Sequence, residues 1–242
     1  MRVAIVAGSI TAGIRIAKEI ERLPTVDASI VVCNPGMKAP FRRWTREFLL
    51  ALKSLEWWAL TANVGGYARA GKLLILRRPL DDPTSIERLK SLQCDVGLHA
   101  ANVIYREATI SAFRLGILNA HIGILPKYRG RCVAEWSILQ GDPIGVTVFF
   151  IDSGIDTGER IVLRKFISSN GKKSVAKLKN MLFGCDARLY RQALEALMRS
   201  EIRFEGNDIL EGKRYYVMSG VFTKVVNEIL RDSDNLGRVN RP

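Results

Sequence analysis

The sequence predicts an α/β fold whose sheet is mostly parallel and flanked by helices, and two observations carry this prediction. First, an apolar run at Arg2–Ala7 precedes a segment, 10–23, in which apolar residues recur at the i, i+4, i+7 spacing of a buried helix face. A second apolar run follows at 29–33, so strand, helix and strand succeed one another within about 30 residues, as in a βαβ unit with parallel strands. Second, later apolar runs continue to alternate with helical patterns.

The remaining elements are predicted from apolar runs that end at turn residues. A helix should begin at Asp82 and Pro83, and a longer one at Ser174, whose hydroxyl can accept a hydrogen bond from a first-turn N–H. Gly184 is a point at which the longer helix could divide in two. Further strands are expected at 73–76, 95–99, 116–121, 146–151 and 161–167, and a terminal strand and helix at 212–217 and 221–230.

Length and composition indicate the domain organisation. The 242 residues, 48% of them hydrophobic, exclude a disordered chain and suit one globular domain over 1–200 with a short C-terminal extension over 201–242. No apolar run approaches the roughly 18 to 20 residues that a membrane-spanning helix needs, and the N-terminus lacks a signal-peptide pattern. We therefore expect no membrane partner and a cytoplasmic location. The four cysteines form no CxxC pair, which argues against a disulfide framework or a zinc site.

The net charge of +13 points to an anionic partner, although a plain basic surface explains it equally well. The excess of Lys and Arg is spread along the chain, and residues 201–242 contain equal numbers of basic and acidic residues. Within 41–58, basic and aromatic residues are mixed in a helical pattern. This segment could stack on nucleobases and contact phosphate, or it could be a surface helix whose aromatics pack inward.

Two polar motifs follow or end predicted strands. Asn119 and His121 are two residues apart on a strand, so their side chains project from one face, next to a loop punctuated by Pro and Gly. An amide donor beside an imidazole is suited to oxyanion stabilisation and proton transfer, and the alternative is a purely structural pair. Asp156 follows a later strand between Gly154 and Gly158, which permit a tight turn that presents its carboxylate or simply caps it with local amides.

In their order and spacing, these motifs resemble the formyltransferase family that uses 10-formyltetrahydrofolate, whose members act on glycinamide ribonucleotide, methionyl-tRNA or sugar amines. The resemblance rests on Asn119-x-His121, Leu-Pro-Lys-Tyr-Arg-Gly at 125–130, Trp136, Gly-Val-Thr-Val at 145–148 and Asp-x-Gly-Ile-Asp-Thr-Gly at 152–158. The matching region is roughly 95–164. The resemblance implies a Rossmann-like formyltransferase fold.

The resemblance also implies a catalytic triad of Asn119, His121 and Asp156. Asn119 would donate an N–H to the formyl oxygen, and a protonated His121 would add a second donor and later move a proton. Asp156 would favour the charged imidazole and position a water for proton relay. The neutral amine is the nucleophile, so activity should rise with pH until His121 loses its proton. The 10-formyltetrahydrofolate acts as co-substrate, and no metal is needed.

Binding residues are implied in the same way, by the loop after the strand that precedes Asn119 and by the loop that carries Asp156. The predicted folate-binding residues are Ala101, Asn102, Val103, Ile104, Tyr105, Ile151 and Asp152. The predicted acceptor-binding residues are Gly8, Ser9, Ile10, Thr11, Tyr128, Arg129 and Arg131, which offer turn N–H groups and guanidinium groups. For each of these residues ordinary packing, a plain turn or a solvated side chain is the alternative.

Several positions depart from the family's usual pattern. Ile122 and Gly123 follow His121 where relatives have Pro-Ser or Gly-Ser, and Phe149 stands where several relatives carry a second histidine. Tyr105 replaces a small residue or a proline in the expected folate loop. The triad is kept, whereas the details of folate binding are left open.

The acceptor that the sequence favours is a small phosphorylated amine, an amino sugar linked to a nucleotide. Enzymes for such sugars often carry the Leu-Pro-Lys-Tyr-Arg-Gly-Arg run of 125–131 and short C-terminal additions. Methionyl-tRNA is the alternative that the net charge supports, although 201–242 is short and neutral for an RNA-binding domain. Glycinamide ribonucleotide, a folate hydrolase activity and a non-catalytic, basic nucleic-acid-binding protein are further alternatives. The oligomeric state is not fixed, and a homodimer is compatible with the sequence.

Overall fold

The computed structural model describes residues 1–33, 57–169, 171–199 and 202–239. They form two compact units, 1–117 and 118–242. The boundary near residue 200 that the sequence predicts lies inside the second unit and stays a prediction. Of the basic and aromatic segment 41–58, residues 41–56 lie outside the described residues, and 57–58 begin helix α3 (Trp57–Arg69).

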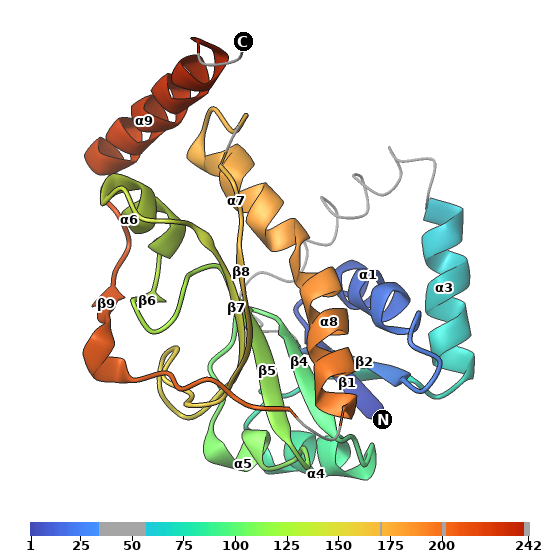
Figure 1. Cartoon of the computed structure of the whole chain (residues 1–242). Helices are drawn as coiled ribbons and strands as arrows, with labels where there is room; N and C mark the ends of the chain where they lie inside the picture. The colour runs from blue at the N-terminus through green and yellow to red at the C-terminus, as the bar shows by residue number, and fades with distance from the viewer. Residues whose placement is uncertain (34–56, 170, 200–201, 240–242) are drawn as a thin grey trace. The chain divides into compact units, whose positions relative to one another are not determined.

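The first unit contains a parallel sheet, as the sequence predicts. Its strands are β1 (Arg2–Ala7), β2 (Asp27–Cys33), β3 (Leu73–Leu76) and β4 (Val96–Ala100). They are ordered β3-β2-β1-β4, and each neighbouring pair is parallel. Figure 1 labels β1, β2 and β4 of this sheet. The central strand β1 is buried from Val3 to Ala7, which explains why it reads as a continuous apolar run rather than as an alternating one.

The helices of the first unit begin where local capping chemistry indicates. Helix α1 (Ile10–Ile20) starts after Ser9, whose hydroxyl accepts a hydrogen bond from the Ala12 N–H, and α1 packs on β1 and β2. Gly13 permits that close packing, because a Cβ there would lie 2.5 Å from Cγ2 of Ile30. Helix α4 (Pro83–Ser91) begins after Asp82, as predicted, and a short helix, α5 (Glu107–Ile110), follows β4.

The three longer strands of the second unit pair antiparallel. They are β5 (Gly116–His121), whose first two residues precede the unit's boundary, β7 (Gly145–Phe150) and β8 (Ile161–Phe166), in the order β5-β7-β8. His121 at the end of β5 lies opposite Thr147 of β7. Parallel pairing in the first unit and antiparallel pairing in the second confirm the α/β class with a mostly parallel sheet and flanking helices.

The helices of the second unit are α6 (Val133–Leu139), α7 (Val175–Gly184), α8 (Asp186–Met198) and α9 (Gly220–Val239). The division of the long helix at Gly184 is confirmed, and α8 packs on β7 and β8. Helix α9 is longer than the predicted 221–230 and contacts α6 and α7. Within the part of the chain that the structure describes, no helix combines the length and apolarity needed to cross a membrane.

A small second sheet joins two distant parts of the second unit. Strand β6 (Tyr128–Gly130) pairs in parallel with β9 (Lys213–Tyr215), which follows the 3-10 helix η1 (Ile209–Glu211). The sequence predicts β9 within 212–217, whereas it gives no sign of β6, which is too short for an apolar pattern. The C-terminal segment is therefore hydrogen-bonded to the loop that follows His121.

The buried hydroxyl of Tyr190 supports the strand that carries the polar motif. Its Oη accepts a hydrogen bond from the Ala120 N–H at 3.0 Å. Tyr190→Phe would leave that partly buried N–H without its partner, so we expect the free energy of unfolding to fall by about 1 to 3 kcal/mol in urea denaturation. Tyr216→Phe is the control, since Tyr216 is 66% exposed, and it should change stability by less than about 0.5 kcal/mol. Equal effects in the two variants would contradict this account.

Candidate active site

Asn119 and His121 lie at the carboxyl end of β5, two residues apart and therefore on one face of the strand. His121 is 7% exposed, and Asn119 is half-buried. Burial on this scale excludes most water from the imidazole, which strengthens its electrostatic interactions with neighbouring groups. The two residues thus form a partly enclosed polar pair at a strand end.

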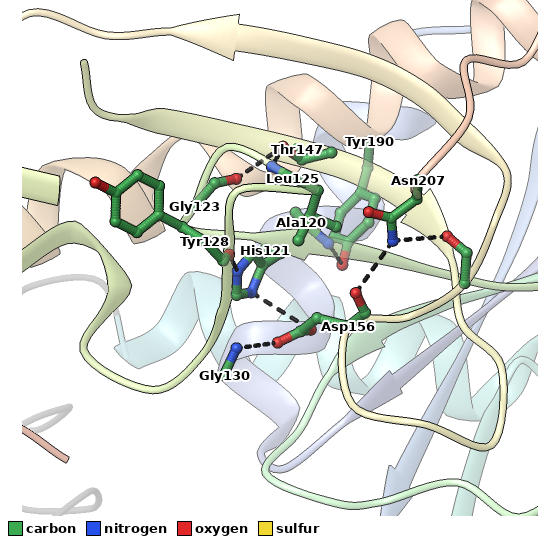
Figure 2. Close-up of polar contacts among 11 residues, drawn as sticks. Ala120, His121, Gly123, Leu125, Tyr128, Gly130, Thr147, Asp156, Tyr190 and Asn207 are labelled. Atoms are coloured by element: carbon green, nitrogen blue, oxygen red, sulfur yellow. Dashed lines mark hydrogen bonds and ion pairs between the residues drawn. The ribbon is translucent and has the colours of Figure 1, made fainter. Parts of the chain in front are cut away.

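The imidazole of His121 is held from both sides (Figure 2). Its Nε2 lies 2.9 Å from the carbonyl oxygen of Tyr128, and its Nδ1 lies 3.4 Å from Oδ1 of Asp156. A carbonyl oxygen can only accept, so Nε2 carries a proton. A neutral ring would then turn the Nδ1 lone pair toward the carboxylate. A doubly protonated ring would present an N–H to each of the two oxygens.

Asp156 lies on a strained turn that several groups hold in place. Its backbone has φ +55°, in the left-handed region that Asp and Asn tolerate better than most residues. Its Oδ2 accepts a hydrogen bond from the Gly130 N–H at 2.9 Å, and its backbone carbonyl accepts one from the Asn207 side chain at 3.1 Å. Gly158 closes the turn, since a Cβ there would lie 1.8 Å from the carbonyl oxygen of Phe150. The carboxylate is thereby fixed between His121 and β6.

The loop between β5 and β6 is tied to β7 by Thr147, which is fully buried. Its hydroxyl donates to the Gly123 carbonyl at 2.7 Å and accepts from the Leu125 N–H at 3.1 Å. Gly123 lies directly against the imidazole, because a Cβ there would be 2.7 Å from His121 Nε2 and 2.9 Å from the Tyr128 carbonyl. The backbone of this loop therefore positions the Tyr128 carbonyl next to His121.

In the first unit, the predicted acceptor turn and the predicted folate loop lie side by side. The Gly8 N–H donates to the carbonyl of Ala100 at 3.1 Å, and a Cβ at Gly8 would lie 3.7 Å from the Cα of Ala101. Both segments follow carboxyl ends of parallel strands, where open α/β sheets bind ligands. The structure thus brings together the predicted acceptor residues Gly8, Ser9, Ile10 and Thr11 and the start of the predicted folate loop, Ala101 and Asn102.

The rest of the predicted folate loop is anchored by Tyr105. Tyr105 is buried, and its hydroxyl lies 2.9 Å from Nδ1 of His99 at the end of β4. Val103 is half-buried and Ile104 is 77% exposed, so the loop presents an apolar side chain to its surroundings.

The other predicted folate residues, Ile151 and Asp152, are half-buried in the second unit. The Asp152 carboxylate accepts hydrogen bonds from the Gly154 N–H at 3.0 Å and from the Thr157 hydroxyl at 2.8 Å. It therefore shapes the loop that carries Asp156. A contact of Asp152 with folate stays a prediction.

Of the predicted acceptor residues in the second unit, Tyr128 has a buried side chain. Its hydroxyl hydrogen-bonds to Asp142 and to Gln140, and its ring stacks on Tyr215 with 5.1 Å between centroids. Burial and the hydrogen bond to Asp142 raise the pKa of Tyr128 well above its usual range. The part of Tyr128 that reaches His121 is its backbone carbonyl.

The two predicted arginines differ in their surroundings. The Arg129 guanidinium donates to the carbonyls of Ile209 at 3.0 Å and Gly212 at 3.2 Å, which attaches it to the C-terminal segment. Arg131 is exposed and follows β6 directly. Arg131 has the better access to an anion, and the binding roles of both arginines stay predictions.

Sequence reasoning missed four groups of this site: the Tyr128 carbonyl, the Gly130 N–H, the Thr147 hydroxyl and the Asn207 amide. The first two are backbone groups, which no residue type reveals. Thr147 lies in the Gly-Val-Thr-Val run, where its pattern is that of a buried strand residue. Asn207 lies 51 positions after Asp156 and within no motif. Among the described residues, no group of three or more His, Cys, Asp or Glu could hold a metal ion.

Comparison with known proteins places this arrangement in a family. The family model described as formyl transferase matches residues 68–194, just over half of the chain. The matched region contains the His121–Asp156 pair and the loops around it. The chain belongs to the formyl transferase family.

Individual relatives share this family. The methionyl-tRNA formyltransferase of Chloroflexus aggregans is 35% identical over 131 residues, which cover 53% of this chain and 42% of that protein. That of Desulfotalea psychrophila is 37% identical over 95 residues, covering 39% of this chain and 29% of that protein. The chain thus spans less than half of the length of these curated relatives.

Solved structures show a similar fold. Glycinamide ribonucleotide transformylase 1 from Symbiobacterium toebii has a TM-score of 0.60 at 18% identity, with 90% of this chain and 94% of that chain covered. A sugar N-formyltransferase from a Shewanella species has a TM-score of 0.58 at 13% identity, with 95% of this chain and 87% of that chain covered. At these identities the likeness is one of fold.

The close approach of Gly123 to the imidazole gives a test of the site's packing. In Gly123→Ala the new Cβ would meet His121 Nε2 and the Tyr128 carbonyl, so we expect the free energy of unfolding to fall by about 1 to 3 kcal/mol. The ring signals of His121 should also move in NMR spectra, with His99 as the internal reference. Gly184→Ala is the control, since nothing lies within 4 Å of its Cβ position. Unmoved His121 signals, or equal stability losses in both variants, would contradict the packing.

Proposed function

We propose that the protein transfers a formyl group from 10-formyltetrahydrofolate to a primary amine. The observation that carries this proposal is the His121 imidazole, held between the Tyr128 carbonyl and the Asp156 carboxylate at the strand end that also carries Asn119. Membership of the formyl transferase family supports it. The arrangement combines a neutral amide donor, a charged donor that can release a proton, and a fixed carboxylate.

The chemistry that these residues can perform follows from their hydrogen-bonding capacity. The bound folate would supply the formyl group. The Asn119 side chain can donate an N–H to an oxygen on which negative charge develops, and His121, when protonated, adds electrostatic stabilisation there. The amine loses a proton as its nitrogen bonds to the formyl carbon, and the departing nitrogen gains one. His121 and Asp156 can carry that proton, directly or through a water.

The chain's residues suit a folate at the loops described above. Loop 101–105 combines an exposed apolar side chain at Ile104, an exposed amide at Asn102 and an anchor at Tyr105. A folate's pterin ring needs both apolar cover and a few fixed hydrogen-bonding groups. The loop that carries Asp156 is itself rigid, because its turns are closed by Asp152 and Gly158. These features suit each loop, taken by itself, to a contact with folate.

The acceptor we propose first is an amine on a nucleotide-linked sugar. The Leu-Pro-Lys-Tyr-Arg-Gly-Arg run supports it, because Arg131 is an exposed cation directly after β6 and can meet a phosphate. Methionyl-tRNA is the second candidate, since the curated relatives named above are methionyl-tRNA formyltransferases, and the net charge of +13 suits RNA.

Substitutions in the proposed triad test the chemistry. Asn119→Ala, His121→Ala and Asp156→Asn should each lower kcat for formyl transfer by about 10²- to 10⁴-fold, because each removes a donor or a proton carrier. The measurement is the rate of tetrahydrofolate release with a saturating acceptor, on variants shown to be folded by circular dichroism. Asp232→Asn, on the exposed face of α9, is the control and should keep the wild-type rate. Near-wild-type rates in the folded triad variants would exclude this assignment.

A screen of acceptors tests the substrate. Amino-sugar nucleotides, glycinamide ribonucleotide and methionyl-tRNA are each offered with 10-formyltetrahydrofolate at two salt concentrations. We expect formylation of an amino-sugar nucleotide with weak salt dependence, since a small acceptor makes few phosphate contacts. If only methionyl-tRNA is formylated, and its formylation falls steeply at high salt, the acceptor is tRNA and not a sugar. The proposal of formyl transfer itself would then stand. Nucleic-acid binding without formyl transfer to any acceptor would overturn the proposed function.

A further inference from the structure

The backbone conformation of Asp156 needs outside support. A non-glycine residue in the left-handed region occupies a sparsely populated conformation, which persists when surrounding groups determine it. The carboxylate can meet His121 and the Gly130 N–H only while this turn is kept. A group that fixes the backbone of 156–158 therefore controls where the carboxylate lies.

Asn207 supplies that support from the C-terminal segment. Its side chain is buried, with 4% of the residue exposed, and its Nδ2 donates to two carbonyls, Asp156 at 3.1 Å and Gly158 at 3.0 Å (Figure 2). A primary amide has two N–H donors, and both are used on the same turn. Asn207 thus bridges the residue that bears the carboxylate and the glycine that closes the loop.

The orientation of the Asn207 amide is determined by its partners. Turning the amide around would place Oδ1 against two carbonyl oxygens, which only accept hydrogen bonds. In the observed orientation Oδ1 is buried and has no hydrogen-bond partner among the described residues. The site therefore uses Asn207 for its donors, and an isosteric carboxylate could not replace it.

The segment that carries Asn207 is anchored on both sides. Before it, Glu205 forms an antiparallel bridge with Ile161 at the start of β8, and the Arg164 guanidinium bonds to the Glu205 carboxylate and to the Gly206 carbonyl. After it, strand β9 pairs with β6, whose Gly130 donates to Asp156. The amide of Asn207 is therefore presented from a segment that is fixed to the same strands as the site.

We propose that Asn207 is a positioning residue, which holds the Asp156 carboxylate beside His121 through the carbonyls of Asp156 and Gly158. This inference rests on the proposed formyl transfer for its catalytic consequence, while the positioning itself can be measured without activity. It also assigns the segment 205–215 a part in the active site.

The kinetic test compares two asparagines of the second unit whose side chains bind backbone groups. In Asn207→Ala and Asn207→Asp, kcat should fall about 10- to 100-fold through misplacement of the carboxylate, with the KM values for folate and acceptor within about twofold of wild type. Asn227→Ala is the matched control, because the Asn227 amide also binds a backbone group, the Val175 N–H at 2.8 Å, between α7 and α9. The control should keep kcat. Equal losses of kcat in the Asn207 and Asn227 variants would overturn the proposal.

A double-mutant cycle tests whether Asn207 acts through Asp156. In an Asp156→Asn background, Asn207→Ala should lower kcat by less than about twofold, since residues that act through one another are not additive. Additive losses of kcat would mean that Asn207 acts independently of the Asp156 carboxylate and would contradict the positioning role.

Hydrogen exchange separates this proposal from the proposed function. The Gly130 N–H donates to Asp156 Oδ2, so it should exchange faster in Asn207→Ala than in wild type or Asn227→Ala. The Arg131 N–H, which donates to the Tyr215 carbonyl at 3.0 Å, is the internal reference and should be unchanged. Unchanged exchange at Gly130 would overturn positioning even in an active enzyme. Faster exchange at Gly130 in a protein that formylates no amine would uphold positioning and reject formyl transfer.

Discussion

The site depends on one constraint: the His121 imidazole is fixed between two oxygen-bearing groups. One is a backbone carbonyl, which carries no proton, and the other is a carboxylate. The Tyr128 carbonyl requires a proton on Nε2, and the Asp156 carboxylate lies on the Nδ1 side of the ring. Because the ring is almost fully buried, these two neighbours dominate its environment. The orientation of the proposed proton carrier therefore follows from where a loop and a turn place two oxygen atoms.

Further contacts of the second unit hold these two oxygen atoms in place. Thr147 ties the loop that bears the Tyr128 carbonyl to β7, and Gly123 leaves the space into which the ring fits. Asn207 and the pairing of β9 with β6 hold the Asp156 turn from the C-terminal segment. Segments far apart in the sequence thus meet around one imidazole, and changes distant from the chemistry can alter it.

Much of the fold could be predicted from the sequence because its signals are local: the buried β1, the capping Ser9 and Asp82, and the break at Gly184. The contact between His121 and Asp156 is predicted through a family resemblance, since spacing alone leaves open a structural Asn119-x-His121 pair and a turn that merely caps Asp156. Strand β6 and the role of its backbone groups could not be predicted, because three residues show no periodicity and backbone donors carry no sequence signature. Asn207 was missed for a related reason, as its partners are carbonyls about 50 residues away.

The most direct test of the central constraint is the protonation of the two imidazole nitrogens of His121, measured by ¹⁵N NMR on histidine-labelled protein across a pH titration. The chain has only two histidines, so His99 provides the comparison in the same spectra. We predict that Nε2 of His121 carries a proton at every pH measured, so that the neutral ring is the Nε2–H form. A neutral Nδ1–H form, with Nε2 unprotonated, would contradict the hydrogen bond to the Tyr128 carbonyl and with it the account of the site.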